Sequence, residues 1–140
     1  MSRDPVPSAA GQPLALRREV GSLRARESRQ VFDPMVSLGV LGGERDSVVV
    51  RAADVPVLDD ALRVDIWCRL LETAEPGWRT GWLTRAGGVE PYDMDHRWLA
   101  AAFRAFAVHE RLLDGFFVIT RSGWRDVRTD ETRVWSRLRL

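Results

Sequence analysis

The sequence predicts an α/β fold, with one domain built from a mixed β-sheet and two main helices. The run F-F-V-I at 116–119 is continuously apolar, as is typical of a strand buried on both faces. Two longer segments carry apolar residues at helical spacing. Residues 80–124 read as strand, helix and strand, the length of one βαβ unit. With 140 residues and 45% apolar residues, the chain has the size and composition of a single globular domain.

The elements follow from these patterns in chain order. Asp59 and Asp93 are acidic residues that open two helices, and the glycine-rich stretch G-G-E-R-D joins two short strands as a hairpin. We expect strands at 35–41 and 47–52, a helix at 59–74, a strand at 78–85, a helix from 93 to about 113, and strands at 116–121 and 132–140.

The N-terminal region is less clearly patterned. Residues 1–13 hold three prolines and several small residues, which predicts a disordered tail before a domain at 14–140. Within 14–30, Leu16, Val20 and Leu23 fit a helical stripe, whereas Gly21 leaves short strands open as an alternative.

Charge and composition limit the partners. The formal net charge is +1, so we do not expect nucleic acid to bind through charge alone. All 21 cationic residues are arginines, whose planar groups suit carboxylates, phosphates and aromatic rings. Cys68, the single cysteine, excludes an internal disulfide and is expected in the core. Without a long apolar run or an N-terminal leader pattern, a cytoplasmic protein outside the membrane is predicted.

Two segments repeat one pattern, W-L-T-R-A-G-G at 82–88 and V-I-T-R-S-G-W at 118–124. If their strands are parallel, both Thr-Arg pairs lie at the carboxyl edge of the sheet, where ligands bind in open α/β folds. That edge also faces the N-terminus of the helix that begins near Asp93. The alternative is that the arginines pair with nearby acids. The residues of this candidate anion site are Thr84, Arg85, Thr120, Arg121 and Asp95.

The last strand offers a second candidate surface. Alternation places Arg133, Trp135, Arg137 and Arg139 on one face and Val134 on the other. Arginine and tryptophan are enriched in protein interfaces, so this face is expected to form an interface, including that of a homodimer, or a charged edge that prevents strand pairing. Stacking on single-stranded nucleic acid is disfavoured by the low net charge.

Catalytic and metal-binding patterns are weak. Asp95 and His96 are adjacent on a helix, so their side chains diverge by about 100° and do not easily share a metal ion. His109 fits the C-terminus of the second helix. Trp67 and Trp98 fit the helix stripes as core residues, while Trp82 and Trp124 flank the two Thr-Arg ends. We therefore expect no cofactor and no metal, and an enzyme is the less favoured interpretation.

Two stretches resemble the JAB/MPN metalloprotease-like family, whose members include isopeptidases and non-catalytic scaffold subunits. G-V-L-G-G at 39–43 is similar to the family's G-x-L-x-G strand, and 81–95 is similar to its metal-binding stretch, with Asp95 at the ligand aspartate. The two histidines fall at Thr84 and Ala86, and Val36 stands where a glutamate is expected. Hydrolytic zinc needs three protein ligands, so the resemblance implies a degenerate, non-catalytic relative.

These observations together predict a non-catalytic binding or assembly module that acts through contacts with a protein partner. The alternative is a small enzyme or sensor that binds a phosphate, nucleotide or carboxylate at the strand-end crevice.

Overall fold

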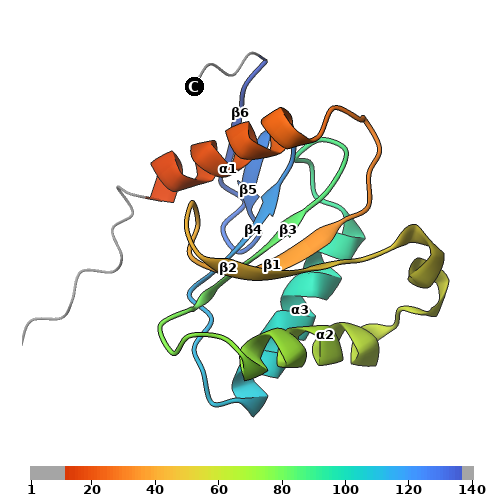
Figure 1. Ribbon diagram of the computed structural model, residues 1–140, viewed down its shortest axis with the longest axis vertical. Helices are drawn as coiled ribbons and strands as arrows, with labels where there is room; N and C mark the ends of the chain where they lie inside the picture. Colours follow the sequence, from red (N-terminus) through yellow and green to blue (C-terminus); the bar gives the residue numbers. More distant parts are fainter. Residues whose placement is uncertain (1–11, 137–140) are drawn as a thin grey trace, which may run out of the picture.

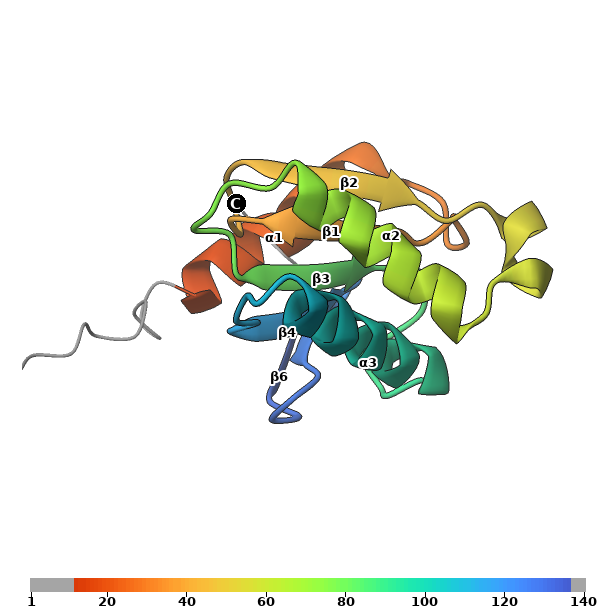
Figure 2. The same cartoon turned by 90° about the horizontal axis from the view of Figure 1, so that it is seen from below.

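The computed structural model describes residues 12–136 and shows an α/β domain in three layers. A mixed sheet of six strands, in the order β2-β1-β3-β4-β5-β6, has helix α1 on one face and helices α2 and α3 on the other (Figures 1 and 2). The elements are α1 (Gln12–Arg26), β1 (Met35–Gly39), β2 (Arg45–Val49), the short 3₁₀ helix η1 (Ala52–Val57), α2 (Asp60–Glu72), β3 (Thr80–Thr84), α3 (Asp93–Val108), β4 (Gly115–Ile119), β5 (Gly123–Asp126) and β6 (Thr132–Val134).

The strand pairing agrees with the predicted topology. Strands β1 and β2 form the expected antiparallel hairpin, with Ser37 opposite Ser47. Strands β3 and β4 pair in parallel through α3, which confirms the predicted βαβ unit. None of the helices within residues 12–136 is long and apolar enough to cross a membrane.

The larger part of the core lies between the sheet and helices α2 and α3. Trp67 and Trp98 are fully buried there, as predicted, and their rings meet edge to face at 6.4 Å between centroids. Phe116 of β4 makes a second edge-to-face contact with Trp67. Gly81 is required beneath this cluster, since an added Cβ would lie 2.9 Å from the Trp67 ring. Cys68, expected in the core, is only half-buried at its margin.

Helix α1 settles the region that the sequence left open and adds a third helix to the two expected. It begins at Gln12, so Gln12 and Pro13 of the predicted tail are helical, while residues 1–11 lie outside the described part. Its apolar stripe packs on the other face of the sheet, against a cluster that includes Trp82 and Trp124. The members of the stripe are Leu16, Val20 and Leu23.

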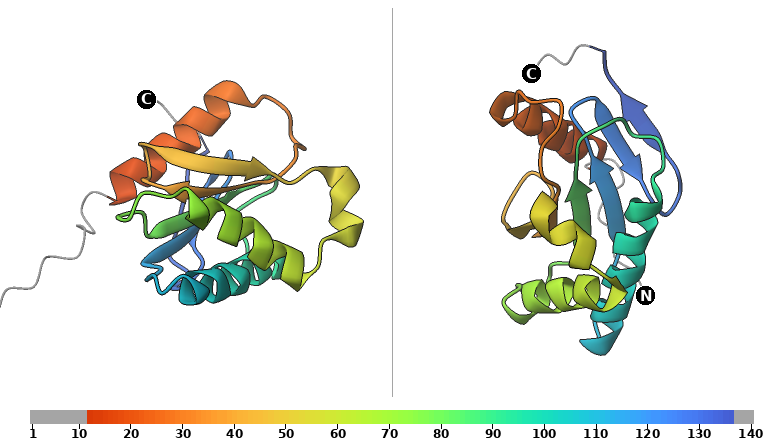
Figure 3. Two further views of the ribbon diagram at one scale, coloured as in Figure 1. Left: turned by 60° about the horizontal axis from the view of Figure 1, so that its bottom comes forward. Right: turned by 90° about the vertical axis from the view of Figure 1, so that its right-hand side faces the viewer.

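The C-terminal strands differ most from expectation. Strand β5, which pairs with both β4 and β6, is not among the strands expected from the sequence. Strand β6 is short and forms one edge of the sheet. Figure 3 shows β6 as the outermost strand on its side of the sheet. Val134, expected on the buried face, is exposed, and Trp135, expected on the exposed face, is half-buried against the cluster that includes α1, whereas Arg133 is exposed as expected. Arg137 and Arg139 lie outside the described residues.

Candidate functional site

The two Thr-Arg segments end at the same edge of the sheet. Thr84 stands opposite Ile119 in the parallel pair, and the backbone N–H of Arg85 donates to the carbonyl of Ile119 at 3.0 Å. Both threonines are buried, and the hydroxyl of Thr120 accepts hydrogen bonds from the backbone N–H groups of Ser122 and Gly123. The predicted common rim therefore exists.

Arg85 is fully engaged on the α3 side of this rim. Its Nε and Nη2 donate to the two carboxylate oxygens of Asp95 at 2.7 and 2.8 Å. Its remaining donors reach the carbonyls of Ala86, Gly88 and Glu90, and its guanidinium lies 3.8 Å from the centre of the Tyr92 ring. Since an arginine has five N–H donors and all five are used, Arg85 has none left for an external anion.

Arg121 lies on the opposite face of the sheet. Its positive charge contributes to lowering the pKa of Glu27, just after α1, to about 2, although the main cause is hydrogen bonding from Arg29. Asp95, the partner of Arg85, belongs to α3 on the other face. Because Thr84 pairs with Ile119, Arg85 is level with Thr120, and Arg121 is one residue farther along the chain. Successive residues of an extended chain point to opposite faces, so the two guanidinium groups share a sheet edge but do not converge on one pocket.

Asp95 sits in a setting that suits a structural carboxylate. It is fully buried, and besides Arg85 it accepts the backbone N–H of Tyr92 at 3.0 Å, which fixes the first turn of α3. Tyr92, not Asp93 as the sequence suggested, occupies the N-cap position. The JAB/MPN resemblance aligns Asp95 with a metal-binding aspartate. In this structure the cation beside Asp95 is the guanidinium of Arg85. Within residues 12–136, no group of three or more His, Cys, Asp or Glu side chains is placed to hold a metal ion.

A groove of about 450 Å³ lies between α1 and β6. Buried Trp124 lies beneath it, and Trp135 stands between two arginines, with the guanidinium carbons of Arg17 and Arg133 at 5.9 and 5.7 Å from its ring. Of the predicted interface residues, Arg133 and Trp135 come together here. We call this region the β6 surface, which consists of Arg17, Trp124, Glu131, Thr132, Arg133 and Trp135.

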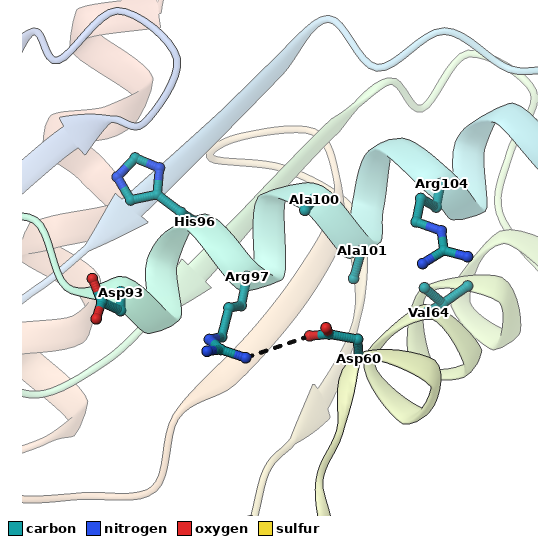
Figure 4. A pocket seen from close by; sticks show the side chains of 8 residues that line it. All are labelled: Asp60, Val64, Asp93, His96, Arg97, Ala100, Ala101 and Arg104. Carbon is teal, nitrogen blue, oxygen red and sulfur yellow. Dashed lines mark ion pairs between the residues drawn. The ribbon is translucent and has the colours of Figure 1, made fainter.

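A second groove, of about 490 Å³, lies between α2 and α3 (Figure 4). Arg97 and Arg104 of α3 and Asp60 of α2 line it, with Ala100, Ala101 and Val64 between them. No pattern in the sequence indicated this groove beforehand. The only signal is a pair of arginines seven positions apart on one helix with three alanines between them, and which helix packs opposite them depends on the tertiary structure.

Comparisons with protein-family models, with curated proteins and with solved structures find no match to this chain.

Proposed function

We propose that this protein is a non-catalytic assembly module whose β6 surface binds a second copy of the same chain. The observation that carries the proposal is an open edge strand with alternating opposite charges, Glu131 and Arg133, beside a groove lined by Trp124 and Trp135. Tryptophan and arginine dominate the energetic centres of protein interfaces. Edge strands are also the part of a sheet that pairs with another chain.

Within residues 12–136, the backbone of β6 pairs with β5 on one side and with no strand on the other. The carbonyl of Glu131 accepts a hydrogen bond from the backbone N–H of Asp126, and the backbone N–H of Trp135 donates to the carbonyl of Ser122. Both bonds are 2.8 Å long. These residues therefore direct their backbone groups toward β5. Because the direction alternates along a strand, the N–H and C=O groups of Thr132 and Val134 point to the open edge. An added strand would bond to these groups.

The charge pattern selects a register for a two-fold antiparallel pair. Centring the pair on Thr132 lets this residue exchange both backbone bonds with Thr132 of the second copy. Glu131 then stands opposite Arg133 of the second copy, and the two-fold symmetry repeats this contact. These residues form non-hydrogen-bonded pairs, in which the side chains of an antiparallel ladder lie closest together. Moving the centre to Arg133 would place the two arginines opposite each other, which is unfavourable.

Trp135 is the expected anchor of this interface. Its ring is only half-buried, and Arg17 and Arg133 flank it. A second copy that covers the groove would remove the exposed part of the ring from water, and apolar burial contributes roughly 25 cal/mol per Å². The backbone hydrogen bonds at Thr132 fix the orientation of the second copy, while the groove supplies most of the contact area.

Sedimentation velocity over a range of concentrations tests the proposal with full-length protein. We expect a reversible dimer that Trp135→Ala weakens. Glu131→Arg and Arg133→Glu should each weaken it by placing like charges opposite each other, and the double variant should restore it with the pairs inverted. Glu44→Arg and Arg51→Glu change the same charges at exposed positions away from β6 and serve as controls. A wild-type monomer at millimolar concentration, or a dimer that neither single exchange weakens, would refute the proposal.

A further inference from the structure

We propose that the groove between α2 and α3 binds the phosphate group of a small ligand. The groove is lined by residues of α2 and α3. Figure 1 shows these two helices on the face of the sheet opposite α1, away from β6. Binding there does not depend on assembly through β6. Arg97, Arg104 and Asp60 line this groove, and Arg63 is hydrogen-bonded to Asp60.

The shape of the groove comes from small residues between long ones. Arg97 and Arg104 are two helical turns apart, about 10 Å along the axis of α3. Ala100 and Ala101 lie between them, and Val64 of α2 completes the apolar floor. Figure 4 shows both arginine side chains directed toward α2 across this floor. A ligand resting on the alanines would thus have a guanidinium at each end.

These guanidinium groups, unlike that of Arg85, have donors to spare. Arg104 makes no hydrogen bond or ion pair with any of the described residues. The one ion pair of Arg97 within that range is to Asp60 at 3.8 Å, too long for a hydrogen bond. Planar guanidinium groups bind phosphate oxygens through pairs of parallel hydrogen bonds. Both arginines can therefore donate to a ligand without breaking a hydrogen bond within the fold.

Asp60 is the single anion that these cations share. Arg63, which is 3% exposed, donates to it at 2.7 Å, and this hydrogen bond is the main cause of the lowered pKa of Asp60. Smaller contributions come from the charges of Arg97 and Arg104. Arg63 and Arg97 thus lie beside one carboxylate, and Arg104 lies farther along the same groove. The Nε of Arg63 is also buried with no hydrogen-bond partner among the described residues.

The other polar residues of the groove lie at its end. Asp93 and His96 are in the first turn of α3, and in Figure 4 their side chains point away from Asp60 and Val64. The interval between Arg97 and Arg104 therefore keeps an excess of positive charge. A doubly charged phosphate group would neutralise this excess better than a single carboxylate. The volume, about 490 Å³, is in the range of small-molecule pockets and leaves room for an organic part.

Isothermal titration calorimetry at constant ionic strength tests the proposal with two probes, inorganic phosphate and glycerol 3-phosphate. We expect saturable binding that Arg97→Gln with Arg104→Gln weakens by at least about tenfold, the value of one charge-assisted hydrogen bond. Tighter binding of glycerol 3-phosphate would identify an organic ligand, and equal binding would identify the free ion. Arg51→Gln with Arg69→Gln removes two exposed arginines outside the groove and is the matched control.

Asp60→Asn provides a test with the opposite sign. Removing the resident carboxylate leaves the arginines without their anion, so phosphate should bind roughly tenfold more tightly. Three results would overturn the proposal: no saturable binding of either probe, an equal loss in the control variant, or an unchanged or lower affinity in Asp60→Asn. Circular dichroism of each variant separates these results from a failure to fold.

Discussion

At the scale of single residues, Arg85 and Asp95 illustrate how a site-like pattern in sequence becomes a structural contact. Arg85 follows a buried strand and precedes two glycines, the setting in which anions often bind. The fold instead directs its guanidinium at Asp95 and three loop carbonyls. The pair joins the end of β3 to the first turn of α3 and so fixes the loop between them.

Asp95→Ala should destabilise the protein severely. Both partners are buried, so the substitution leaves a buried guanidinium without its counter-ion and removes the acceptor of the Tyr92 N–H. Breaking one side of such a pair costs about 3–5 kcal/mol of unfolding free energy. Urea denaturation followed by tryptophan fluorescence measures the change.

Asp93→Ala is the matched control for this measurement. Asp93 is an exposed acid in the same helical turn, so its loss should cost less than about 1 kcal/mol. Replacing both partners, as Arg85→Met with Asp95→Leu, should recover much of the loss, because no unpaired charge then remains. Equal destabilisation by Asp93→Ala and Asp95→Ala would show that the buried pair is not the cause.

The sequence could predict the neighbourhood of Arg85 but not its partner. Glu90, Asp93 and Asp95 all lie within ten residues of it, and each is an acceptable carboxylate. Selecting Asp95 requires the rotation of α3 about its own axis, which depends on how Trp98 packs in the core. That packing is a tertiary property and leaves no local signal.

At the scale of elements, the regions best predicted are those whose pattern is local. The buried run of β4 and the apolar stripe of α3 can each be identified within one segment. Strand β5 could not be, because G-W-R-D is short and half polar, and it is a strand only because β4 and β6 pair with it on either side. Helix α1 was ambiguous because three apolar residues among many arginines define only a narrow stripe.

Glu19 holds α1 to the β1–β2 hairpin. Glu19 is 4% exposed. Its carboxylate accepts hydrogen bonds from both terminal nitrogens of Arg45 and, at 2.6 Å, from the backbone N–H of Gly42. The guanidinium of Arg45 in turn lies 4.9 Å from the centre of the Trp82 ring. This cluster joins a helix to a hairpin that follows it in the chain.

Glu19→Ala should loosen α1 before it affects the rest of the fold. The change removes the carboxylate that pairs with Arg45 and leaves the backbone N–H of Gly42 without its acceptor. We expect the free energy of unfolding to fall by about 3 kcal/mol. Hydrogen exchange should accelerate in α1 while α3 stays protected, since α3 is on the other face of the sheet. Arg18→Ala, an exposed change on the same helix, is the control. Uniform acceleration in both helices would contradict this local role.

At the scale of the whole molecule, the sheet has two edges of different character. Strand β2 is at one edge and β6 at the other, and this order is not deducible from local patterns because β1 lies between β2 and β3. Along β6 and the residues on either side of it, Glu131, Arg133 and Trp135 alternate in the chain and line the groove beside α1. The two charges are of opposite sign, and an edge protected from pairing by repulsion would carry like charges. The proposed pairing of two copies through β6 depends on this difference in sign.

Mixing the two charge variants tests this self-complementarity directly. In a two-fold pair centred on Thr132, a Glu131→Arg chain and an Arg133→Glu chain complement each other, because every cross-strand pair again joins opposite charges. We expect each variant alone to be mainly monomeric and an equimolar mixture to form a heterodimer, as measured by native mass spectrometry with one isotope-labelled chain. High salt should weaken the heterodimer only in part, because the Trp135 groove contributes apolar burial that salt does not screen. A mixture that stays monomeric while wild type dimerises would place the contact in another register or on another surface.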